Sequence, residues 1–112
     1  MFIVNGVEWN IVFVEPTNDV LMRSDGSRTV GVTDSRTKTV YLSDLLSGEF
    51  LKKVISHEMC HVYCMSYGIY MDIQTEEIVA DFIATWGRSV IETADIVFGM
   101  VKNTRLLDGC IQ

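Results

Sequence analysis

Apolar and polar residues follow one pattern in the first half of this chain and a different pattern in the second half. β-Branched and aromatic residues dominate Val7–Val14, and two shorter runs of the same kind cover 28–33 and 37–42. Runs of this kind, separated by residues typical of turns, predict β-strands. Asp34-Ser35-Arg36 lies between the last two runs, and its composition predicts a hairpin turn there.

Beyond Ser47 the spacing of the apolar residues changes to that of a helix. The spacing predicts a helix over Gly48–Tyr67, with Ser47 as the residue that caps its start. Gly68 follows the last helical position, where a glycine commonly ends a helix. The stretch is apolar on most of its sides, so we expect this helix to be largely buried.

A second helical pattern follows a connection over 69–74. Thr75 is the expected cap, and the pattern runs to about Arg88. It continues to about Val101, bent or broken near Gly87. Three large apolar side chains on this helix are interpreted as core residues, namely Phe82, Ile83 and Trp86. Strands followed by helices predict an α+β fold, with a small antiparallel or mixed sheet of about three strands and then a helical layer.

The composition fits one folded domain over residues 1–112. Apolar residues make up 48% of the chain and proline occurs once, which argues against disorder. The formal net charge of −6 argues against direct nucleic-acid binding, because phosphate backbones attract basic surfaces. We find no apolar run long enough to span a membrane and no basic, apolar leader. Three cysteines imply no disulfide framework, so we expect a cytoplasmic protein without a membrane partner.

Both histidines of the chain lie in one short motif, His57-Glu58-Met59-Cys60-His61, on the first predicted helix. Residues four apart on a helix share a face, with Cβ atoms about 5–6 Å apart, so both imidazoles can bind one ion. The HExxH spacing is typical of zinc sites, where the glutamate reaches a water that the metal activates. The motif therefore predicts Zn²⁺ held by His57 and His61, with Glu58 as the general base.

An open zinc site takes three protein ligands, and the third one here must be a carboxylate or a thiolate. Glu77 is the best candidate, because it and Asp81 are four residues apart on the second helix. Asp81 is expected to accept the free ring N–H of a ligand histidine, first of all His57, which would fix its tautomer. Glu76 remains an alternative ligand, because predicted helix boundaries shift by a residue or two. Cys64 is a second alternative, although three ligands from one straight helix would strain a tetrahedral site; we expect the helix cysteines to be small packing residues.

The two helix motifs resemble those of the zincin metallopeptidases. The pair His57-Glu58-x-x-His61 and Glu77-x-x-x-Asp81 is similar to the gluzincin arrangement. The short spacing between the motifs, the strand-rich start and the runs 56–63 and 76–84 resemble the ImmA/IrrE family of small metallopeptidases from phages and mobile elements. The resemblance implies a minimal zincin-like fold and a cytoplasmic zinc endopeptidase that often cleaves a repressor.

The sequence thus predicts a zinc-dependent endopeptidase that hydrolyses a peptide bond in a protein or peptide substrate. The alternative is a non-catalytic module with a peptidase fold, and the presence of Glu58 favours the enzyme. A closed structural zinc site would need a fourth ligand from Cys60 or Cys64, so it is the weakest hypothesis. The oligomeric state is not predicted. Two accessory roles stay open: pairing of the run 37–42 with substrate as a sheet edge, and oxyanion stabilisation by Tyr41, Tyr67 or Tyr70.

Overall fold

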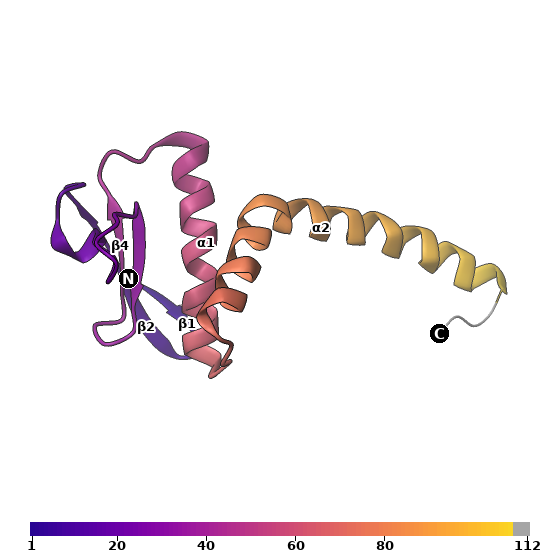
Figure 1. The fold of residues 1–112 in the computed structure, drawn as a ribbon. Coiled ribbons are helices and arrows are strands. Elements are labelled where there is room, and N and C mark those ends of the chain that lie inside the picture. Colours follow the sequence, from indigo (N-terminus) through magenta and orange to yellow (C-terminus); the bar gives the residue numbers. More distant parts are fainter. Residues whose placement is uncertain (109–112) are drawn as a thin grey trace.

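The computed structural model describes the backbone of residues 1–108 and the side chains of residues 1–104. Within these residues it has a four-stranded mixed sheet and two long helices (Figure 1). The strands are β1 (Phe2–Val4), β2 (Val7–Val14), β3 (Gly31–Asp34) and β4 (Thr39–Ser43), and a short 3₁₀ helix covers Asp19–Leu21. The helices are α1 (Gly48–Tyr67) and α2 (Ile73–Asp108). The predicted α+β class is confirmed, with four strands where about three were expected.

The strands lie in the order β1-β2-β4-β3. The outer pairs, β1 with β2 and β3 with β4, are antiparallel, and β2 pairs with β4 in parallel at the centre. The run 37–42 was expected as a possible sheet edge, but it forms most of β4, which has a hydrogen-bonded neighbour on each side. That expectation is wrong. Both edge strands contact α1, and β3 does so more extensively than β1.

β1 lies outside the predicted strands, and a tight turn joins it to β2. The two turn residues, Asn5 and Gly6, have φ angles of 49° and 77°. A two-residue hairpin turn of type I′ requires such left-handed values at both central positions, and Asn-Gly adopts them readily. The side-chain amide of Asn5 donates to the carbonyl oxygen of Ser66 at 3.0 Å, which ties the hairpin to the end of α1.

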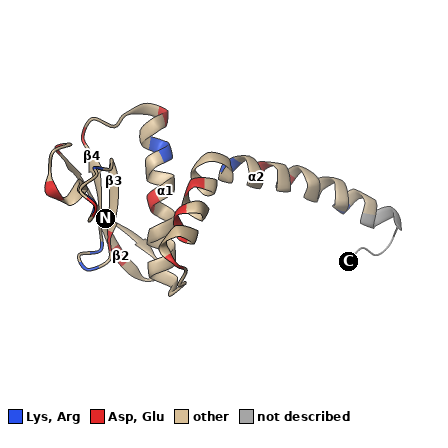
Figure 2. Cartoon of the chain, in the orientation of Figure 1, with Lys and Arg blue, Asp and Glu red and all other residues tan. Residues whose placement is uncertain are grey.

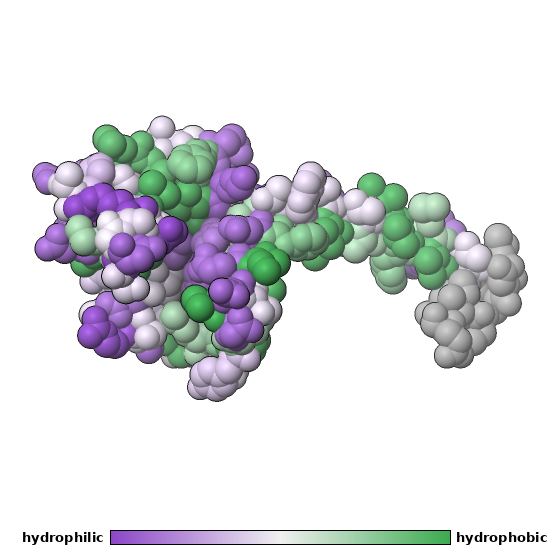
Figure 3. Space-filling view, in the orientation of Figure 1, coloured by the Kyte–Doolittle hydropathy of each residue, from purple (hydrophilic) through white to green (hydrophobic). Residues whose placement is uncertain are grey.

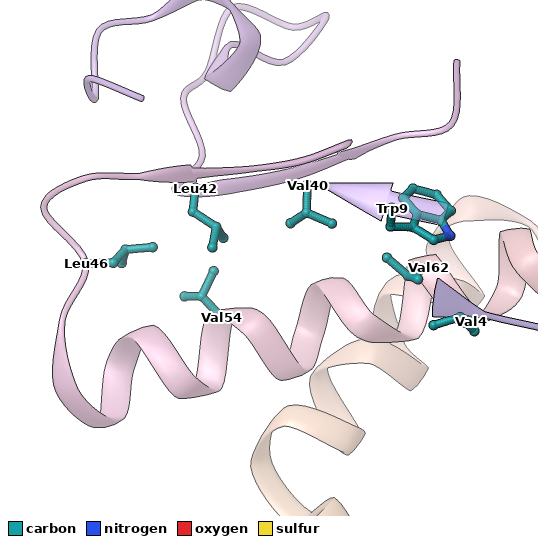
Figure 4. Close-up of a cluster of buried hydrophobic side chains, with 7 residues drawn as sticks. All are labelled: Val4, Trp9, Val40, Leu42, Leu46, Val54 and Val62. Carbon is teal, nitrogen blue, oxygen red and sulfur yellow. The ribbon is translucent and has the colours of Figure 1, made fainter. Parts of the chain in front are cut away.

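One face of the sheet packs on α1 and forms the main core (Figure 4). The buried side chains come from three strands, the loop before α1, and α1 itself: Val4, Trp9, Val40, Leu42, Leu46, Val54 and Val62. Trp9 is fully buried, and its Nε1–H donates to Ser66 Oγ at 2.9 Å. A large buried ring with a satisfied N–H stabilises the contact between sheet and helix. This contact fixes α1 along the sheet, and with it the two histidines.

α1 begins and ends where predicted. Ser47 precedes it in an extended conformation, but its side chain makes no capping hydrogen bond, so only the position of the predicted cap is confirmed. Gly68 follows the helix with φ 65° and ψ 34°, and its N–H donates to the carbonyl oxygen of Cys64. This left-handed residue ends the helix and turns the chain back toward α2.

α2 begins two residues before the predicted cap. The capping side chain is Asp72 instead of Thr75: its carboxylate accepts the backbone N–H of Thr75 at 3.0 Å and the Thr75 hydroxyl at 2.7 Å. The helix then continues without a break to Asp108. Figure 1 shows that it changes direction in its orange part and then leaves the rest of the chain. The radius of gyration is 18.0 Å, against about 13 Å for a compact chain of this length.

The distal part of α2 corrects the predicted core. Phe82, Ile83 and Trp86 are 55%, 40% and 57% exposed, so their interpretation as core residues is wrong. The reason is the bend, which carries the helix away from α1 before these side chains can be covered. Figure 3 shows hydrophobic residues on the surface of this projecting part. No described helix has the length and hydropathy of a membrane span.

Candidate metal centre

The predicted site forms where α1 passes the first turns of α2, and acidic residues lie on both helices there (Figure 2). His57 and His61 lie one turn apart on α1, with ring centroids 5.2 Å apart. Glu77 comes from α2, and one ligand atom from each of the three residues lies within 4.8 Å of the others. One ion could contact all three atoms, so the structure brings together a possible metal-binding triad.

Glu77 faces the same nitrogen of both imidazole rings. Its Oε2 lies 3.1 Å from His57 Nε2, and its Oε1 lies 3.0 Å from His61 Nε2. The other ring nitrogens have carboxylate partners of their own. His57 Nδ1 lies 2.9 Å from Asp81 Oδ1, and His61 Nδ1 pairs with Glu76 Oε2. Because a carboxylate only accepts hydrogen bonds, these contacts suit the tautomer that has its proton on Nδ1.

These contacts separate the roles of two adjacent glutamates. Glu77 occupies the position predicted for the third ligand. Glu76, the alternative ligand, pairs instead with His61 Nδ1, the outer nitrogen of the ring, which does not face Glu77. Asp81 pairs with the outer nitrogen of His57 in the way that the sequence predicts. A carboxylate on the outer nitrogen fixes the ring orientation and leaves the inner nitrogen as a donor to a metal.

The donor set suits a cation. A neutral imidazole with its proton on Nδ1 has a lone pair on Nε2, and both lone pairs would face the oxygens of Glu77. Acceptors this close repel each other unless a proton or a cation lies between them. The cluster also gathers four carboxylates around two rings, from Glu58, Glu76, Glu77 and Asp81. A divalent cation would offset this charge and accept all three donors of the triad.

Glu58 lies beside the triad and is the most buried of these acids, with a side chain 7% exposed. Burial raises the pKa of its carboxyl group, while a hydrogen bond from Thr33 and the charges of His61 and His57 oppose that rise. The Thr33 hydroxyl on β3 donates to Glu58 Oε1 at 2.8 Å. The free oxygen, Oε2, lies 4.0 Å from His57 Nε2. Glu58 is therefore close enough to exchange a proton at the site without occupying a ligand position.

β3 passes close to α1 at Gly31. A Cβ atom there would lie 2.9 Å from Val54 Cγ1 and 3.3 Å from Glu58 Cγ, which is too close for a comfortable contact. The absent side chain lets the edge strand lie against Glu58. A pocket of about 290 Å³ opens beside it, lined by residues 29–31, His57, Glu58, Glu77 and Asp81, with Arg23, Phe50 and Lys53. The pocket thus connects the triad with the edge of β3.

The cysteines of α1 lie outside the triad. Cys60 and Cys64 are buried against Ala80, as predicted for packing residues. Burial, reinforced by neighbouring Cys64, raises the pKa of the Cys60 thiol to about 12, so the thiol stays protonated and is a poor metal ligand. Among the described residues that line the pocket there is no tyrosine, although an oxyanion role was considered for Tyr41, Tyr67 and Tyr70.

Three features of the site lie outside the sequence predictions: Thr33, Gly31, and the contact of Glu76 with His61. Thr33 and Gly31 are far from the motif in sequence, and a short run of strand residues gives no sign of which residue meets a helix. For Glu76 the only signal was its acidity beside the expected ligand. We compared the chain with protein-family models, curated proteins and solved structures, and none of them matches it.

Proposed function

We propose that this protein is a zinc-dependent endopeptidase and that His57, His61 and Glu77 hold the Zn²⁺. The observation that carries the proposal is the pairing of both outer ring nitrogens, by Asp81 and Glu76. This pairing turns both Nε2 atoms toward Glu77 and leaves them available to one ion. Two imidazoles and one carboxylate are the protein ligands of many hydrolytic zinc sites. The same donors also suit iron, and the HExxH helix is the feature that favours zinc.

A bound zinc ion would supply a water of lowered pKa and polarise the substrate carbonyl group. Glu58 accepts a proton from the attacking water and later donates it to the leaving amine. Its burial supports this role, because a carboxyl group with a raised pKa releases and accepts protons more readily near neutral pH. Thr33 holds one oxygen of Glu58, so the other oxygen is the one that moves the proton.

The surroundings of the triad suit an extended peptide as substrate. The pocket includes Gly31 at the start of β3, which has a strand neighbour on one side only among the described residues, so an extended peptide could pair along the other side. Arg23 and Lys53 also line the pocket, opposite in charge to the acidic cluster. The motif resemblance to ImmA/IrrE peptidases supports a cytoplasmic setting and a repressor or other regulator as the target.

The proposal is tested with the wild-type protein, Glu58→Gln, and Glu49→Gln as a matched control. Glu49 lies in the exposed first turn of α1, away from the triad. Each protein is incubated with Zn²⁺, dialysed, and measured for metal content by elemental analysis. It is then incubated with unfolded casein and a peptide library, and products are identified by mass spectrometry. We expect zinc in all three proteins, and a loss of cleavage of about 100-fold or more only in Glu58→Gln.

Other results would separate the parts of the proposal. Undiminished cleavage by Glu58→Gln would remove Glu58 as the general base. Zinc bound by the wild-type protein without cleavage of any substrate would favour the non-catalytic module. A wild-type protein that binds no zinc would overturn the proposed metal site.

A further inference from the structure

The part of α2 beyond the bend, here called the arm, presents an apolar surface that the rest of the described chain leaves uncovered. Every residue from 88 to 98 is exposed. Exposed apolar side chains on the arm include Val90, Ile91, Val97, Phe98 and Val101. The hydrophobic surface is visible along the arm in Figure 3. A helix with so much apolar surface is normally covered by another element.

Between Val90 and Val101, one face of the arm carries no charged residue, while exposed apolar residues also lie on its other sides. One stripe follows the spacing i, i+4, i+7, i+11 of a single helix face and consists of Val90, Ala94, Val97 and Val101. The charged residues with described side chains between 92 and 102 lie roughly opposite this stripe, and they are Glu92, Asp95 and Lys102. A partner helix could therefore pack on the stripe without burying a charge.

An apolar groove lies at the base of the arm, between α1 and α2. Its volume is about 780 Å³, and its walls include Ile55 and Met59 from α1 and Ile83, Val90 and Ile91 from α2. Arg88 lies at the groove, where its guanidinium donates to Ser56 Oγ at 3.2 Å. The groove is large enough to receive several apolar side chains from a helix.

We propose that a second copy of this chain covers both surfaces. The stripe of each copy lies in the groove of the other, so the two arms pack antiparallel about a twofold axis. A twofold contact is self-complementary, and each copy supplies one groove and one stripe. The axis would pass near Ala94, whose small side chain allows the two helices to approach closely.

The size of the uncovered surface suits a weak dimer. The apolar residues of groove and stripe expose roughly 500 Å² per chain, or about 1,000 Å² in the pair, which is at the low end for a specific protein–protein contact. An anionic membrane is a poorer match. Helices that bind such membranes carry mainly Lys and Arg on their polar side, whereas the charged side of this arm mixes Glu92 and Asp95 with Lys102, in a chain of net charge −6.

The test compares Val97→Asp with a matched control, Asn103→Asp. The first substitution places a carboxylate on the stripe, and the second places the same group near the charged side. Molar mass is measured by light scattering and by sedimentation equilibrium from about 1 to 100 µM. We expect a wild-type dimer with Kd of about 10 µM or lower. Val97→Asp should raise the Kd at least about 100-fold, because each dimer would bury two unpaired carboxylates, and Asn103→Asp should leave it unchanged.

A second variant, Ile91→Asp, tests the groove and should also weaken the dimer. Both Val97 and Ile91 are exposed in the single chain, so the variants should keep the wild-type fold, which circular dichroism checks. A wild-type protein that is monomeric at about 100 µM would overturn the proposal. So would a dimer insensitive to both Val97→Asp and Ile91→Asp, or a monomer that binds vesicles of anionic lipid. These measurements need neither zinc nor cleavage, so their outcome is independent of the proposed function.

Discussion

The two parts of α2 belong to one helix but differ in what surrounds them. In the first turns Ala80 is fully buried against α1, and the nearby acids face the histidines. Beyond the bend, side chains of equal apolar character, such as Val90 and Val97, are exposed. Both parts have a helical pattern with an apolar face. The comparison teaches that an apolar helix face in a sequence predicts that something will pack against this face. Whether the same chain supplies that contact depends on where its other helices and strands lie.

The largest expected effect extends the contrast between covered and uncovered side chains to the two tryptophans, of which Trp9 lies on β2 and Trp86 on α2. Trp9→Ala removes a fully buried ring and its hydrogen bond to Ser66, so we expect the free energy of unfolding to fall by about 3–5 kcal/mol. Trp86 is exposed on α2, and Trp86→Ala should change this free energy by at most about 0.5 kcal/mol in the monomer. Urea unfolding at about 1 µM protein, followed by circular dichroism, measures both.

The same two variants, measured at higher protein concentration, test whether the exposed arm is covered by a second copy. Trp86 lies four residues before Val90 on the same helix face, so a second copy that covers the arm should contact it. Trp86→Ala should then lose stability relative to wild type as the protein concentration rises, because association contributes to stability by mass action. Trp9→Ala should show its loss at every concentration. If both variants lost a similar amount of unfolding free energy at about 1 µM, Trp86 would belong to a core of the single chain. That result would contradict the contrast between a buried Trp9 and an exposed Trp86.

A second prediction concerns the two glutamates in the first turns of α2. Glu77→Gln removes the carboxylate that faces both Nε2 atoms, and we expect zinc affinity to fall about 100–1000-fold. Glu76→Gln alters only the partner of His61 Nδ1, and the expected loss is about 10–100-fold. Competition with a chromophoric chelator measures both affinities. Glu92→Gln, on the arm, is the control and should bind zinc as wild type does; a reversed order for Glu76 and Glu77 would exchange their roles.

The smallest expected effect concerns the contact between β3 and Glu58. Thr33→Val removes the hydrogen bond to Glu58 Oε1, which helps to lower the pKa of that carboxyl group. Without it the pKa rises, so the base stays protonated to higher pH and the acid limb of the kcat/KM profile should move to higher pH. Since a hydrogen bond to a charged group contributes about 1.5–3 kcal/mol, we expect activity at neutral pH to fall about tenfold. Thr37→Val, in the exposed turn before β4, is the control; equal profiles for both variants would contradict a role for Thr33.

The parts of the site that could be predicted depend on local geometry. The spacing of His57 and His61, and of Glu77 and Asp81, places each pair on one helix face whatever the rest of the fold does. The choice between Glu76 and Glu77 needed the actual start of α2. The helix starts at Ile73, two residues before the predicted cap, and its packing on α1 turns Glu77 toward the Nε2 atoms.

The missed parts depend on contacts between distant segments. The order β1-β2-β4-β3 places β3, and not β4, at the edge beside α1, and nothing in the run 37–42 indicates that it has neighbours on both sides. Gly31 and Thr33 acquire their roles only through that order. β1 is different, because Asn5-Gly6 is a strong hairpin signal between apolar residues and could have been recognised.

The arm also determines how the molecule moves through water. The chain measures 60 Å in its longest dimension and 29 and 28 Å in the others. Hydrodynamic friction on such a particle exceeds that on a sphere of equal mass, so a single chain should diffuse and tumble slowly for its size. Two chains with antiparallel arms would double the mass and add much less to the length. The frictional ratio should therefore fall on association, and the sedimentation coefficient should rise by more than it would for a dimer with the elongated shape of the single chain.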